Sequence, residues 1–125
     1  MAEAAEIRLT IPGRPVPAVR MTKRGKHINR RAQSYLAYKD EIGWTARANR
    51  IRPFAPDVIL EIMIRVYVAG ESPGDWDNYG KSVCDALNGV AYDDDQQIKR
   101  GSVEVIHVDR RLDQRVEVVI RPLSA

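Results

Sequence analysis

Every second residue between Val58 and Val68 is a branched aliphatic side chain, which is the period of a β-strand with one buried face. The set is Val58, Leu60, Ile62, Ile64, Val66 and Val68. An apolar strand face of this length needs a cover, so the rest of the chain must supply helices that pack on it. The expected architecture is therefore a sheet with helices on one side.

Shorter segments with the same alternation lie on both sides of this strand. Residues 7–11 alternate between apolar and polar side chains and end at Pro12, which predicts a first strand. Two further strands are expected at 102–108 and 115–121. The polar turn between them, residues 109–114, favours a hairpin.

Two segments carry apolar residues at helical spacing. Ser34 is expected to cap a helix that runs to about Asn49, with a buried face of Tyr35, Tyr38, Ile42 and Ala46. A second helix is expected after Gly74, from the apolar stripe of Tyr79, Val83, Ala86, Leu87 and Val90. The sequence thus predicts one α+β domain over residues 1–125, a mixed β-sheet with two main helices packed on it in the order β-α-β-α-β-β.

The composition excludes several classes of protein. No segment approaches the roughly 18 apolar residues of a membrane span, and the N-terminus is acidic where a signal peptide is basic. The single cysteine, Cys84, excludes an internal disulfide and a multi-cysteine zinc site. We expect a cytoplasmic protein with no membrane partner.

Charge is strongly segregated along the chain. The window from Glu71 to Asp95 contains seven acidic residues and one basic residue, Lys81, which leaves 19 basic and 10 acidic residues elsewhere. A basic surface attracts phosphate-rich ligands, and a local group of carboxylates suits a hard metal cation. The combination points to a metal-dependent nuclease.

Asp77, Lys81 and Asp85 are spaced four apart, so on a helix they form one polar row roughly opposite the apolar stripe. Asp75 precedes this row. Taken singly, these residues also fit a plain helix cap with ordinary helical ion pairs. An EF-hand calcium loop does not fit, because its fifth and twelfth positions would be Tyr79 and Ala86.

Asp95 joins Asp75 and Asp77 only if the chain runs back along the helix. The helix advances about 15 Å between residues 78 and 88, and residues 89–95 span at most about 23 Å when extended. Closure within one subunit is feasible with little slack. Delivery of Asp95 across a dimer interface is the alternative.

The acidic window follows the pattern Asp75-x-Asp77-Asn78-x-x-Lys81-x-x-x-Asp85-Ala86-Leu87-Asn88-Gly89-Val90, and then Tyr92-x-Asp94-Asp95-x-Gln97-Ile98. This pattern resembles the signature of the RusA family of Holliday junction resolvases. Residues 11–17, Ile-Pro-Gly-Arg-Pro-Val-Pro, and the basic loop with Gly25 also resemble the N-terminal pattern of the family.

The resemblance implies a bacterial or phage α+β homodimer that binds four-way DNA junctions and makes paired symmetric nicks with Mg²⁺, for which Mn²⁺ is the expected substitute. It implies metal-ligand and catalytic roles for Asp75, Asp77 and Asp95, and an essential basic role for Lys81. Asp94 is a further candidate metal ligand, and Asp85 also matches an acidic position. In the implied reaction a metal-activated water attacks the scissile phosphate. Lys81 would face this phosphate and stabilise the negative charge that it gains.

The stretch from residue 20 to residue 31 is the candidate DNA-binding element, since bases spread along a glycine-containing loop can follow a phosphate backbone. Its basic residues are Arg20, Lys23, Arg24, Lys26, Arg30 and Arg31. Two other functions remain open from the sequence: a metal nuclease acting on other branched DNA, and a non-catalytic DNA-binding module. Mg²⁺-dependent nicking of a four-way junction separates these possibilities.

Overall fold

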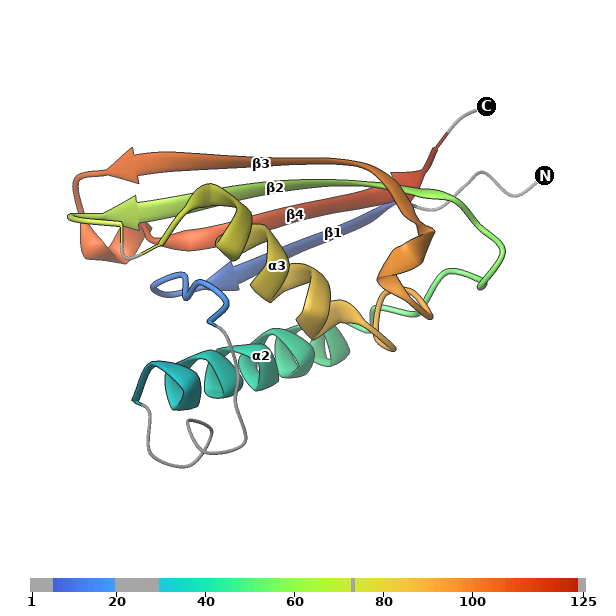
Figure 1. Cartoon of the computed structure of the whole chain (residues 1–125), viewed down its shortest axis with the longest axis horizontal. Helices are drawn as coiled ribbons and strands as arrows, with labels where there is room; N and C mark the ends of the chain where they lie inside the picture. Colours follow the sequence, from blue (N-terminus) through green and yellow to red (C-terminus); the bar gives the residue numbers. More distant parts are fainter. Residues whose placement is uncertain (1–5, 20–29, 73, 124–125) are drawn as a thin grey trace.

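The computed structural model describes residues 6–19, 30–72 and 74–123. Its elements are β1 (Ile7–Pro12), α2 (Arg30–Ala48), β2 (Leu60–Ala69), α3 (Trp76–Leu87), β3 (Ile98–Val108) and β4 (Arg115–Pro122), with short 3-10 turns η1 (Asp95–Gln97) and η2 (Arg111–Asp113). Both helices lie on one face of a four-stranded mixed sheet (Figure 1). The element order confirms the expected α+β fold. Within the described ranges, no helix has the length and hydrophobicity needed to cross a bilayer.

The strands run in the order β1-β4-β2-β3 across the sheet, so the expected hairpin between the last two strands is wrong. β4 pairs antiparallel with β1 and β2, whereas β3 pairs parallel with the other edge of β2. The cause is α3, which carries the chain back toward the start of β2 and makes β3 run in the same direction as β2. Because β3 occupies one edge of β2, β4 pairs with the other edge.

The face of the sheet beneath the helices forms the core. On the predicted face of β2, Leu60, Ile62, Ile64, Val66 and Val68 are all buried, which confirms that face. Ala69, at the end of the strand, is buried as well, and Val58 precedes the strand and is half-buried. The alternate residues of β1 and β4 join this core: Ile7, Leu9, Ile11, Val116, Val118 and Ile120. The period of two thus sets which face of each strand the helices cover.

Helix α2 begins at Arg30, four residues before the predicted cap at Ser34, which lies exposed inside the helix. Residues 30–33 are good helix formers, and the buried Ala32 gives the extra turn a packing contact. The predicted inner face of α2 is confirmed, because Tyr35, Tyr38, Ile42 and Ala46 are all buried.

Helix α3 buries its predicted stripe through Tyr79, Val83 and Leu87, and Ala86 is half-buried. Val90 is buried too, although it lies beyond the end of the helix. The polar row consequently faces away from the sheet, as the spacing predicts.

Two glycines lie inside the helices, in different surroundings. A Cβ atom on Gly80 would lie 2.6 Å from Cγ2 of Val103, so α3 packs on β3 at a distance that only glycine permits. A Cβ atom on Gly43 would meet only the flexible end of Arg47, with Nη1 at 3.4 Å. The first glycine is required by packing, and the second is not.

Gly80→Ala is expected to lower the free energy of unfolding by about 1–3 kcal/mol, because α3 must move off β3 or Val103 must shift. Gly43→Ala is the matched control in α2. It is expected to raise that free energy by about 0.5–1 kcal/mol, since alanine favours the helix. Urea denaturation of both variants measures the difference, and a loss of stability in both would contradict the distinction.

Candidate active site

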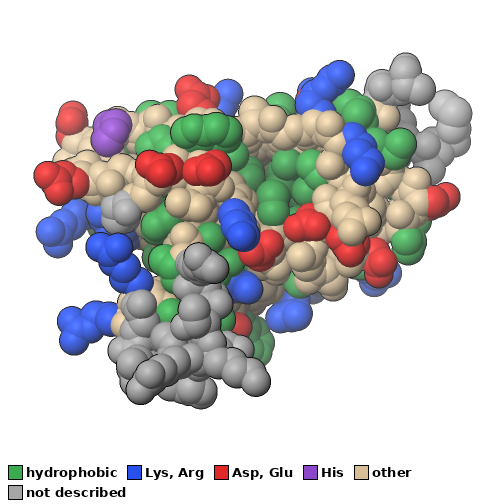
Figure 2. All heavy atoms as spheres, in the orientation of Figure 1, with side chains coloured by type: hydrophobic (Ala, Val, Ile, Leu, Met, Phe, Trp, Pro, Cys, Tyr) green, Lys and Arg blue, Asp and Glu red, His purple; other side chains and the backbone are tan. Residues whose placement is uncertain are grey.

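Helix α3 presents the polar row on its outer face. Asp77 and Lys81 are exposed and Asp85 is half-buried. Acidic side chains gather over α3 and over the segment that follows it, on the face of the molecule shown in Figure 2. No ion pair joins Lys81 to either aspartate of the row among the ion pairs of the described residues. The ordinary helical ion pairs that the spacing allows are therefore not formed.

Asp75 stands at the N-cap position of α3, but its side chain makes no capping hydrogen bond. Its backbone oxygen accepts hydrogen bonds from the amides of Asn78, at 3.1 Å, and Tyr79, at 3.3 Å, and its side chain is exposed. A capping role does not occupy this carboxylate, which leaves its oxygens available to a ligand.

The acidic segment (Asp93, Asp94 and Asp95) is held in place by Gln97, which is 8% exposed. The Gln97 Oε1 atom accepts hydrogen bonds from the amides of Asp93, at 2.9 Å, and Asp94, at 3.1 Å. Its Nε2 atom donates to the carbonyl oxygens of Ala55, at 2.9 Å, and Val58, at 3.0 Å. One side chain thus ties the acidic segment to the loop that leads into β2.

Asp94 caps η1, because its Oδ1 atom accepts a hydrogen bond from the amide of Gln96 at 2.9 Å. With Gln97 it forms a capping box. This structural role uses one acceptor site of the Asp94 carboxylate and leaves the others compatible with the predicted metal-ligand role. The spacing Asp94-x-x-Gln97 is the sequence signal for this box.

Asp95 lies beside the C-terminal part of α3. Its amide donates a hydrogen bond to Oδ1 of Asn88 at 2.9 Å. Burial raises the pKa of the Asp95 carboxyl, the neighbouring carboxylates of Asp94 and Asp85 raise it further, and Asn88 opposes the shift. The crowding of negative charge at this end of α3 is the condition that a bound cation relieves.

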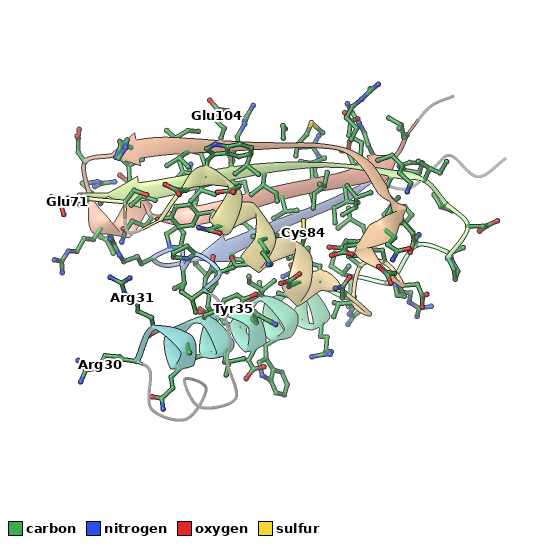
Figure 3. The ribbon with its side chains drawn as sticks, in the orientation of Figure 1. Arg30, Arg31, Tyr35, Glu71, Cys84 and Glu104 are labelled. Carbon is green, nitrogen blue, oxygen red and sulfur yellow. The ribbon has the colours of Figure 1, made fainter. Side chains whose placement is uncertain are left out.

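Asp85 is fixed by helix α2. The Tyr35 hydroxyl donates a hydrogen bond to Oδ2 of Asp85 at 2.9 Å. Figure 3 shows Tyr35 extending from α2 toward α3. Sequence periodicity places Tyr35 on the inner face of α2, but it does not reveal which polar group its hydroxyl meets.

The carboxylates therefore form two groups. Asp75 and Asp77 lie at the N-terminal end of α3, and Asp85 and Asp95 lie at its C-terminal end. Asp77 and Asp85 are separated by about 12 Å along the helix axis, from a rise of about 1.5 Å per residue. Within the described ranges, no three such side chains are grouped closely enough to hold a metal ion. The predicted joint site of Asp75, Asp77 and Asp95 stays a prediction.

The family model for Endodeoxyribonuclease RusA matches residues 12–121. The chain belongs to the RusA family. This confirms the resemblance, and the match covers most of the chain. A search of curated proteins found no match.

As a RusA protein, the chain is an endodeoxyribonuclease, a hydrolase of phosphodiester bonds at DNA crossovers. The family acts on Holliday junctions, and its resolvases depend in general on divalent metal ions. Oxygen ligands suit such ions, and the exposed carboxylates of Asp75 and Asp77 offer such ligands.

Two of the six basic residues assigned to DNA binding in this RusA protein can be placed. Arg30 and Arg31 are exposed at the start of α2 (Figure 3). With Arg14 they line a groove of about 650 Å³ that reaches Gly74 and Asn78 at the start of α3. Much of the remaining lining is apolar and comes from residues 15–19; we call the whole groove the cationic groove after its three arginines. The other four, Arg20, Lys23, Arg24 and Lys26, lie outside the described residues.

Arg14 was not identified from the sequence. Its guanidinium donates to the carbonyl oxygens of Ala69, at 3.0 Å, and Glu71, at 2.8 Å, and to Oε1 of Gln114 at 2.8 Å. These acceptors are uncharged, so the bonds fix the side chain without neutralising it. The sequence signal is a lone arginine between Gly13 and Pro15, which is weak.

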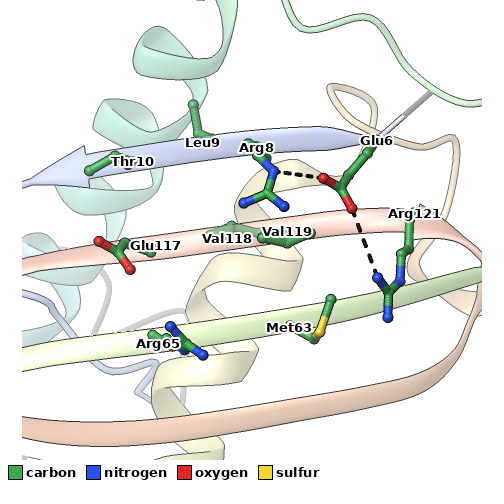
Figure 4. Close-up of a pocket in the computed structure, with 10 residues that line it drawn as sticks. All are labelled: Glu6, Arg8, Leu9, Thr10, Met63, Arg65, Glu117, Val118, Val119 and Arg121. Carbon is green, nitrogen blue, oxygen red and sulfur yellow. Dashed lines mark hydrogen bonds and ion pairs between the residues drawn. The ribbon is translucent and has the colours of Figure 1, made fainter.

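The other face of the sheet carries a hollow of a different kind. A hollow of about 440 Å³ is lined there by arginines and glutamates from β1, β2 and β4 (Figure 4). Arg8 pairs with Glu6 at 2.6 Å, and Arg121 pairs with Glu61 at 2.9 Å. Compensated charge of this kind is typical of the solvated face of a sheet.

Cys84 does not supply a nucleophile. Burial raises the pKa of its thiol to about 11, so the thiol is protonated at neutral pH. Its side chain packs against the core, in agreement with the small apolar role expected for a lone cysteine.

Proposed function

We propose that this RusA protein resolves four-way DNA junctions as a homodimer by paired symmetric nicks in a Mg²⁺-dependent reaction. One observation carries the proposal: the exposed carboxylates of Asp75 and Asp77 stand at the end of α3 that borders the cationic groove. A phosphate backbone held by arginines beside free carboxylates is the arrangement that metal-assisted hydrolysis needs.

The residues present fit a magnesium ion. Mg²⁺ is usually held by one or two carboxylates together with substrate phosphate and water, without a complete protein cage. Asp75 and Asp77 supply two carboxylates that make no ion pair among the described residues. Asp95, with Asp94 as a further candidate, would complete the set. When bound, the ion lowers the pKa of a water molecule and neutralises charge on the phosphate.

The chain's own residues would orient the DNA. Lys81 follows Asp77 by one helical turn on the same face, so its ammonium group can meet the scissile phosphate and stabilise added negative charge. Arg14, Arg30 and Arg31 would hold the flanking backbone. Their contribution is to affinity and to its dependence on salt.

A homodimer follows from the reaction. Two symmetric nicks need two active sites, and a two-fold dimer matches the approximate two-fold symmetry of a four-way junction. The separation of the two carboxylate groups adds a second reason, because Asp95 of a second subunit is one route by which Asp75 and Asp77 gain a third carboxylate. Approach within the subunit is the other route.

The test is a cleavage assay with a synthetic four-way junction and with linear duplex, each with and without Mg²⁺. We expect paired nicks in the junction with Mg²⁺ or Mn²⁺, and none in EDTA. If other branched DNA were cut in preference to the four-way junction, that DNA and not the junction would be the substrate. Binding without cleavage under every metal condition would indicate a non-catalytic DNA-binding module.

A further inference from the structure

We propose that Tyr35 is a positioning residue of the active site, which holds the Asp85 carboxylate in its place beside Asp95. The proposal rests on the nuclease function proposed above and deepens it. It assigns to helix α2, which begins at the basic residues Arg30 and Arg31, a direct part in organising the carboxylates of α3.

The hydrogen bond between the two helices is well defined. The Tyr35 side chain is 3% exposed, and its hydroxyl lies 2.9 Å from Oδ2 of Asp85. Lys39, one turn further along α2, places Nζ 5.0 Å from the centre of the Tyr35 ring, so the ring itself has a second contact. Asp85 makes no ion pair with Lys39 or with Lys81.

Asp85 needs such a donor because its neighbours are acidic. Asp85 and Asp94 both lie close enough to Asp95 to act on it electrostatically. A half-buried carboxylate that is repelled by others turns toward water unless a donor retains it. The Tyr35 hydroxyl supplies that donor and leaves Oδ1 of Asp85 available.

Tyr38 provides an internal comparison. It lies on the same face of α2 and is 4% exposed, but its hydroxyl has no hydrogen-bond partner among the described residues. Both tyrosines fill space in the core, and Tyr35 alone of the two meets a carboxylate of α3. Phenylalanine keeps the ring in either position and removes only the hydroxyl.

The experiment compares Tyr35→Phe, Tyr38→Phe, Asp85→Ala and the double variant Tyr35→Phe/Asp85→Ala. Single-turnover cleavage of a synthetic junction is measured with Mg²⁺, junction affinity is measured in EDTA, and the urea midpoint of unfolding is measured without metal. Tyr35→Phe is expected to slow cleavage by about 10- to 100-fold, the usual effect of losing a contact that orients the carboxylates around a metal ion, which is the role proposed here for Asp85 beside Asp95. Its junction affinity should stay within about twofold of the wild-type value, which a general loss of structure would not allow.

The double variant separates positioning from packing. If Tyr35 acts through Asp85, Tyr35→Phe should cause no further loss of rate in the Asp85→Ala background, since the two residues then act as one unit. Tyr38→Phe should cleave at the wild-type rate. Additive losses, a wild-type rate for Tyr35→Phe, or an equal loss for Tyr38→Phe would each overturn the proposal. A wild-type protein that cuts no junction would instead refute the proposed function, and that outcome is visible before any variant is compared.

Discussion

Asp77→Asn and Asp95→Asn are each expected to abolish junction cleavage while junction binding persists or becomes tighter. Each change removes a negative charge that would bind the metal and that, without metal, repels DNA. The rate should fall by at least roughly 100-fold, since changes to residues that only orient metal ligands already cost about 10- to 100-fold. Single-turnover cleavage and binding measured in EDTA give the two quantities.

Asp93→Asn is the matched control for this pair. It removes the same single charge as either variant, it lies in the acidic segment that contains Asp95, and the Asp93 side chain is exposed and has no assigned role in the site. We expect it to cleave at close to the wild-type rate. A wild-type rate for Asp77→Asn or Asp95→Asn would show that the metal-ligand assignment is wrong.

Lys81→Ala is expected to reduce cleavage by about 100- to 1,000-fold, the range found when one preorganised donor to a developing negative charge is removed. The change should affect affinity much less, because one surface lysine supplies a small share of the phosphate contacts of a basic protein. Lys81 is free of ion pairs with Asp77 and Asp85, so its removal breaks no structural pair of α3.

Lys99→Ala serves as the control for Lys81, since Lys99 is an exposed lysine at the start of β3 rather than on α3. Its cleavage rate should match that of the wild type. If Lys81→Ala weakened binding and cleavage by the same factor, the residue would be a DNA-binding contact and not part of the chemistry.

The sequence was sufficient for the layers of the fold but not for the order of the strands. The alternation in β2 and the stripe of α3 are strong, because burial of one face is set locally by spacing. Strand pairing depends on where α3 returns the chain, and neither 102–108 nor 115–121 carries a signal for its partner. A polar turn between two strands therefore suggested a hairpin that the sheet does not contain.

For the candidate site, too, local spacing was sufficient for some features, whereas others depend on how the elements pack together. The polar row of α3 followed from helical spacing, and the family pattern identified Asp75, Asp77, Lys81 and Asp95 as the residues of interest. The pairing of Tyr35 with Asp85 was not predictable, since it depends on how two helices lie across one sheet. The role of Gln97 was partly accessible through the capping-box spacing, whereas its bonds to Ala55 and Val58 required the tertiary structure.

The Gln97 side chain also makes the placement of the acidic segment depend on a distant part of the chain. Its two bonds to the loop before β2 join residues 42 and 39 positions apart, and β2 and α3 lie in the segment between them. The closure of that long segment is what keeps the acidic segment in place. A change in the loop before β2, far from any carboxylate of the acidic segment in the sequence, is therefore expected to displace Asp93, Asp94 and Asp95 together.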